Sequence, residues 1–89
     1  MSKELVDVLN SICALLERYE EVGWFSMLER VKMLAVDEVA GARQEIRSLF
    51  GGMGSLSDVV LCRDGTFDKR DNDEFDRLRR QLYELSGKS

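Results

Sequence analysis

The chain has 89 residues, of which 44% are hydrophobic and 34% are charged, and its formal net charge is −4 at pH 7. This length and composition predict one folded domain and exclude a disordered chain. The negative charge disfavours binding to nucleic-acid phosphates, and no apolar run reaches the roughly 18 residues of a membrane span. We therefore expect no nucleic-acid partner and no membrane partner.

Two residue types are missing altogether: proline and histidine. The absence of proline favours helices. The absence of histidine excludes histidine-dependent nucleophilic catalysis and histidine-ligated zinc. The two cysteines, Cys13 and Cys62, lie far apart in apolar segments, which predicts two buried, reduced thiols. The N-terminus shows no signal-peptide pattern. Together with the two reduced thiols, this predicts a cytoplasmic location.

The first predicted helix covers residues 3–21. Apolar side chains recur at helical spacing along it, and they fall on one face of a helical wheel: Leu5, Leu9, Ile12, Leu16 and Tyr19. Together with the apolar residues beside them, they form an apolar arc of roughly 200° around the helix. One packed neighbouring element covers only about 100°. This helix is therefore expected either to contact two elements or to leave an apolar strip for a partner.

Two more helices are predicted at 24–36 and 38–50. Gly23 is expected to end the first helix, and Asp37 is expected to cap the third, because glycine adopts the left-handed conformation and aspartate accepts from helix N-terminal amides. The pair Gly51-Gly52 ends the third helix.

An ordered, loop-rich connector is predicted over residues 51–71, followed by a last helix over 72–86. Within the connector, residues 59–62 are expected to be extended and residues 63–66 to form a turn. Asp71 or Asn72 is expected to cap the last helix. The fold class is therefore all-α: a compact bundle of about four short helices in a single domain over 1–89.

The chain carries no recognisable catalytic constellation. The acidic residues between positions 68 and 74 lack the glycine and glutamate spacing of a calcium-binding EF-hand. The glycine cluster at 51–54 follows a helix rather than a strand, and no Lys-Ser/Thr pair follows it, so it is a weak phosphate-binding signal. We expect a protein that is not an enzyme and that binds no metal and no cofactor.

The segment 46–61, with Arg79 in the last helix, resembles a family of small uncharacterised bacterial proteins that carry a Phe-Gly-Gly-Met-Gly-Ser-Leu-x-Asp signature. The matching residues are Phe50, Gly51, Gly52, Met53, Gly54, Ser55, Leu56 and Asp58. The resemblance implies an immunity-type protein that binds and neutralises a cognate bacterial toxin, either at the toxin's active site or at an exosite. From the residues themselves we expect the Asp58 carboxylate to accept backbone amides or to pair with Arg79, holding the turn shut.

These observations predict a non-catalytic protein-binding domain. Its partner is expected to be a toxin, which an acidic inhibitor would attract by charge if the toxin is basic. The candidate contact residues lie near the turns between helices: Glu17, Glu20, Glu21, Trp24, Asp37 and Glu38. The alternative is a self-associating structural or regulatory helical module, a homodimer whose apolar arc packs against its own copy.

Overall fold

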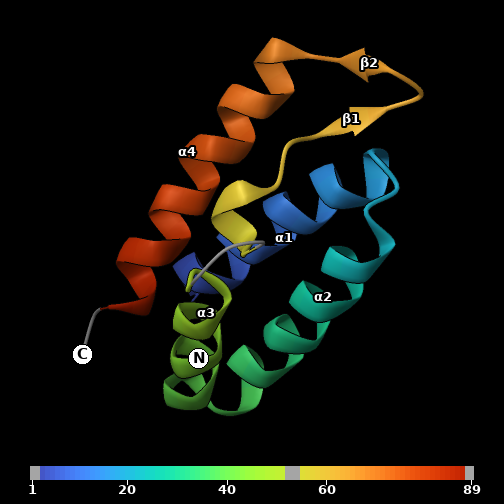
Figure 1. Ribbon diagram of the computed structural model, residues 1–89. Coiled ribbons are helices and arrows are strands. Elements are labelled where there is room, and N and C mark those ends of the chain that lie inside the picture. Colours follow the sequence, from blue (N-terminus) through green and yellow to red (C-terminus); the bar gives the residue numbers. More distant parts are fainter. Residues whose placement is uncertain (1–2, 52–54, 88–89) are drawn as a thin grey trace.

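A computed structural model describes residues 3–51 and 55–87 of the chain. These residues form four α-helices, one 3₁₀ turn at Leu56–Asp58 and one short antiparallel hairpin, which confirms the predicted all-α class (Figure 1). The elements are α1 (Lys3–Arg18), α2 (Val22–Asp37), α3 (Val39–Leu49), β1 (Cys62–Arg63), β2 (Thr66–Phe67) and α4 (Lys69–Ser86).

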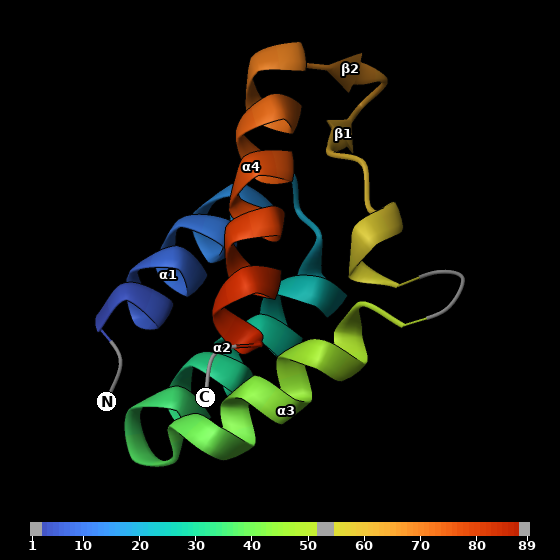
Figure 2. The same cartoon turned by 90° about the vertical axis from the view of Figure 1, so that its left-hand side faces the viewer.

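Helix α1 packs against both α2 and α4, and α3 packs against the same two helices (Figures 1 and 2). The core lies between the four helices and is closed by Leu56 and Leu61 from the connector. All five residues of the predicted apolar stripe are buried in it, four from α1 and the last just after its end: Leu5, Leu9, Ile12, Leu16 and Tyr19. The wide apolar arc of α1 is therefore covered by two elements of the same chain.

The turn between α1 and α2 is made by Glu20, which has a φ of 57°. The backbone amide of Glu21 donates to the carbonyl of Leu16 at 2.9 Å, so this turn satisfies a carbonyl that the end of α1 leaves free. The expectation that Gly23 ends the first helix is wrong, because Gly23 lies in the first turn of α2. Helix α1 ends at Arg18 rather than at residue 21.

A single residue, Glu38, joins α2 to α3. Its amide donates to the carbonyl of Leu34 at 2.7 Å, and its carbonyl accepts from the amide of Ala42 at 3.1 Å. Glu38 thus ends one helix and begins the next. The expectation that Asp37 caps the third helix is wrong, because α2 continues through Asp37 and Glu38 occupies the N-cap position of α3.

The connector between α3 and α4 contains the hairpin, in which Cys62 pairs with Phe67 and Arg63 with Thr66. Its two-residue turn places Asp64 at a φ of 53° and Gly65 at 77°. Positive φ at both positions is what a type I′ two-residue hairpin turn requires, and Asp-Gly provides it at low cost. Cys62 is exposed in β1, which corrects the expectation of a buried thiol, whereas Cys13 is buried as expected.

Helix α4 begins at Lys69, earlier than the predicted residue 72, and its N-cap is Asp68. The Asp68 carboxylate accepts from the backbone amide of Asp71 at 3.0 Å. The predicted caps, Asp71 and Asn72, are therefore inside the helix. Their side chains bind other parts of the chain instead.

Candidate functional site

The six residues proposed as partner contacts do not form one surface. Glu17, Glu20, Glu21 and Trp24 lie at the α1–α2 turn, whereas Asp37 and Glu38 lie at the other end of α2. Helix α2 has 16 residues, so about 24 Å separates the two groups. A partner that contacts both groups must span the whole length of α2.

At the α1–α2 turn the acidic residues have different surroundings. Glu20 forms an ion pair with Arg63 of the hairpin at 2.9 Å, and both side chains are exposed. Glu20 also lines a small cavity of about 120 Å³, together with Glu17, Glu21 and Phe25. Trp24 is half-buried and packs against the core, which makes it a structural residue of α2. This group is mainly an exposed, acidic turn.

At the α2–α3 turn the two acidic side chains also differ. The Glu38 carboxylate lies over the first turn of α3, because a Cβ placed on Gly41 would come within 3.2 Å of it. A carboxylate there complements the positive end of the α3 dipole. Asp37 instead lines a groove between α2 and α3.

This groove is mainly apolar, and its volume is about 650 Å³. Its lining consists of Met27, Arg30, Val31, Met33, Leu34, Asp37, Glu45 and Leu49. Of these, only Asp37 was predicted from the sequence as a contact residue. The sequence did contain one sign of this groove. Helix α2 has more apolar residues than its buried stripe needs, and two of these, Met33 and Val36, are exposed.

The glycine motif is described only in part, and its residues Gly52, Met53 and Gly54 lie outside the described residues. Phe50 packs edge-on against Tyr83 of α4, with ring centroids 5.3 Å apart. Ser55 is buried, and its Oγ lies 2.8 Å from that of Ser57. Leu56 is fully buried in the core. The described flanks of the motif therefore serve packing.

Arg79 of α4 holds the connector in place. Its Nη1 donates to the carbonyls of Leu56 at 2.9 Å and Val59 at 2.8 Å, and its guanidinium lies 4.4 Å from the centroid of the Phe75 ring. Burial lowers the pKa of Arg79 below its ordinary value, while the nearby charges of Asp76 and Asp58 oppose that shift. The charge of Asp58 acts on Arg79, and the hydrogen bonds of Arg79 close the turn through the backbone carbonyls of Leu56 and Val59.

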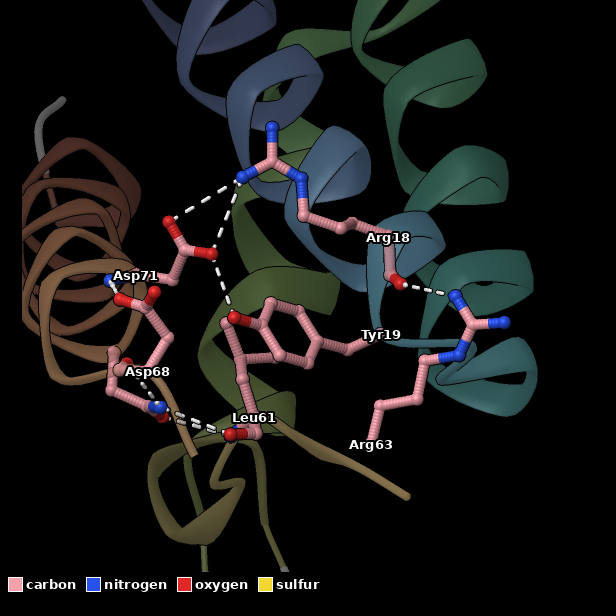
Figure 3. A network of polar contacts seen from close by, with 7 residues as sticks. Arg18, Tyr19, Leu61, Arg63, Asp68 and Asp71 are labelled. Atoms are coloured by element: carbon pink, nitrogen blue, oxygen red, sulfur yellow. Dashed lines mark hydrogen bonds and ion pairs between the residues drawn. The ribbon is translucent and has the colours of Figure 1, made fainter. Parts of the chain in front are cut away.

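A second polar network joins the end of α1 to the start of α4 (Figure 3). The Tyr19 hydroxyl donates to the Asp71 carboxylate at 2.6 Å, and Arg18 forms an ion pair with the same group at 3.2 Å. The hydrogen bond to Asp71 raises the pKa of Tyr19 to about 12. In return, the Tyr19 hydroxyl and then Arg18 hold the pKa of Asp71 below its usual range. These paired groups stabilise the helix contact.

Asn72 lies next to this network and binds the connector. Its side chain accepts from the amide of Leu61 at 2.8 Å and donates to the carbonyl of the same residue at 2.9 Å. The Asn72 carboxamide therefore makes the two hydrogen bonds that a neighbouring strand would make. It satisfies the backbone amide and carbonyl of Leu61, which is fully buried.

Within residues 3–51 and 55–87, no three His, Cys, Asp or Glu side chains are grouped so that they could hold a metal ion. No helix in the described part of the chain is both long and apolar enough to cross a bilayer.

A family model described as a domain of unknown function (DUF6966) matches residues 17–69, from the end of α1 to the start of α4. The match covers more than half of the chain, so the chain belongs to this family. No curated protein and no solved structure matches it.

Proposed function

We propose that this member of the DUF6966 family is a non-catalytic protein-binding domain, an immunity-type protein that binds and neutralises a cognate bacterial toxin. The observation that carries the proposal is the outer side of α2. Val22 and Met33 are each 70% exposed there, and Val36 is 50% exposed, while Leu28, Val31 and Ala35 on the inner side are buried. Met33 and Val36 are three residues apart on this side of α2, and neighbouring exposed apolar side chains are typical of a binding surface.

The charge of the chain supports a basic partner. The net charge of −4 raises the association rate with a positively charged protein and disfavours association with other acidic proteins. The resemblance of the Phe-Gly-Gly-Met-Gly-Ser-Leu-x-Asp segment to immunity-type proteins favours a toxin as that partner. The cytoplasm is the proposed location, in keeping with two free thiols, Cys13 and Cys62.

The test is to mix the purified protein with the purified product of the adjacent gene, both at micromolar concentration, and to analyse the mixture by size-exclusion chromatography with light scattering. We expect a stable complex and the loss of that product's toxic activity. Free monomers of both proteins would contradict the proposal.

The same measurement without the second protein tests self-association, which the exposed apolar side of α2 also permits. A toxin-binding monomer has the mass of one chain, 10.2 kDa, at every concentration. A mass that doubles as concentration rises would favour the homodimeric module instead.

A further inference from the structure

We propose that the groove between α2 and α3 is where the partner docks, and that its occupant is an amphipathic helix presenting aliphatic side chains and at least one lysine or arginine. This inference rests on the proposed function and adds the site and the chemistry of the partner. The shape, the lining and the charge of the groove support it.

The shape of the groove favours a helix. Met27, Val31 and Leu34 follow one another at spacings of four and three residues along α2, and Leu49 faces them from α3. Rows of this spacing form ridges and grooves into which the side chains of another helix pack. The described strands are two residues long, so they offer little edge for strand addition.

The apolar lining is adaptable. Two of the lining residues are methionines, Met27 and Met33, whose flexible, polarisable side chains fit partners of varied shape. Met33 is 70% exposed, so covering it removes apolar surface from water without any change in the core.

The charges of the lining select a basic occupant. The groove has two carboxylates, Asp37 and Glu45, and one guanidinium, Arg30, which leaves a net charge of −1. Neither carboxylate forms an ion pair with any residue that the structure describes. The last turn of α2, which contains Asp37, has no basic residue to complement the negative end of the helix dipole. A lysine or arginine of the partner would supply that missing positive charge.

The first arm of the test uses a synthetic helical peptide of about 14 residues, which is close to the length of α2. It carries leucines on one face and lysines beside them, and a second peptide has glutamate in place of each lysine. Binding to the full chain is measured by fluorescence anisotropy. We expect only the lysine peptide to bind, with amide NMR shifts concentrated on the residues of α2 and α3 that line the groove.

Two variants locate the site. Met33→Ser removes an exposed apolar contact, and Asp37→Asn with Glu45→Gln removes both carboxylates. Each is expected to weaken peptide binding by about three- to tenfold, as partly exposed contacts do. The matched control, Asp64→Asn with Glu84→Gln, makes the same charge change at exposed positions outside α2 and α3 and should leave the affinity unchanged. Equal losses in both charge variants, or equal binding of both peptides, would overturn the inference.

The second arm repeats the comparison with the toxin. If the toxin binds wild type, Met33→Ser and the Asp37/Glu45 variant equally, the groove is not the site, although the proposed function stands. If the toxin does not bind but the lysine peptide occupies the groove, the proposed function fails and the groove chemistry stands. If the chain forms a dimer that Met33→Ser dissociates, a second copy is the occupant and the inference is wrong.

Discussion

The side chain of Asn72 binds both backbone polar groups of Leu61, accepting from the amide at 2.8 Å and donating to the carbonyl at 2.9 Å. This pairing ties the connector to α4 at a point where the connector has no strand beside it. Because Leu61 is fully buried, losing either hydrogen bond leaves a polar group without a partner in the core.

Asn72→Asp keeps the acceptor for the Leu61 amide but replaces the donor to the Leu61 carbonyl with a negative oxygen. We expect a loss of about 1–3 kcal/mol in the free energy of unfolding, measured by urea denaturation. Asn10→Asp, the same chemical change at an exposed position of α1, is the control and should have a much smaller effect. Equal losses in the two variants would show that the Asn72 contact is not stabilising.

Arg79→Ala removes the donor that serves the carbonyls of Leu56 and Val59. We expect a loss of about 2–3 kcal/mol, because both carbonyls lose a charged donor and the Phe75 ring loses its covering guanidinium. Thermal unfolding followed by circular dichroism measures it. Arg80→Ala is the matched control, since the Arg80 side chain is 77% exposed and its ion pair with Asp76 lies on the surface. A loss for Arg80→Ala as large as that for Arg79→Ala would contradict the assignment.

Tyr19→Phe removes the hydroxyl that binds Asp71 and should lower the melting temperature by a few degrees at neutral pH. The pKa of Tyr19 is raised from an ordinary value of 10.0 to about 12, so folding favours the protonated hydroxyl. Its contribution is therefore complete below pH 10 and is lost as the pH rises through 12. Melting curves of wild type and Tyr19→Phe should converge over that window. A difference that stays constant up to pH 12 would contradict the hydrogen bond.

The Asp71 carboxylate of the same contact can be tested at acidic pH. The pKa of Asp71 is lowered by Tyr19 and Arg18, so its contribution is present above the ordinary value of 3.8 and is lost as the pH falls through the lower folded value. Asp71→Asn should therefore differ from wild type at neutral pH and approach it in acid. Tyr19→Phe keeps the Asp71–Arg18 ion pair and should not reproduce the whole effect.

A fragment covering residues 17–69, the segment that the family model matches, is expected to be unfolded. It lacks most of α1 and nearly all of α4, which pack against each other and bury Leu9, Ile12, Phe75 and Leu82. Circular dichroism and a thermal melt of the fragment, beside the full chain, test this. A cooperative transition in the fragment would show that the core does not need the two outer helices.

The helices were predictable because their buried residues recur at the helical period, and the periodic residues of α1 are all in the core. The start of α4 was not predictable, because Asp68, Asp71 and Asn72 are all suitable N-cap residues. In the folded protein the side chains of Asp71 and Asn72 bind Tyr19 and Leu61, and Asp68 is the N-cap.

The candidate site was predictable only in its acidic character. Asp37 was identified from its charge, but the groove it lines depends on how α3 crosses α2, which places Leu49 and Glu45 opposite Met27 and Leu34. That crossing leaves no periodic signal in either helix alone. The same limit applies to the wide apolar arc of α1, whose coverage by α2 and α4 is a property of the packed molecule.

The single-residue joint at Glu38 also bears on how the molecule folds. The two walls of the groove come from helices that are adjacent in sequence, so their contacts close only short loops of chain. The Tyr19–Asp71 contact, in contrast, spans 52 positions. The α2–α3 contacts can therefore form early in folding, while the contact between α1 and α4 completes the core later. Substitutions that weaken the α2–α3 contact should mainly slow folding, whereas Tyr19→Phe should mainly speed unfolding.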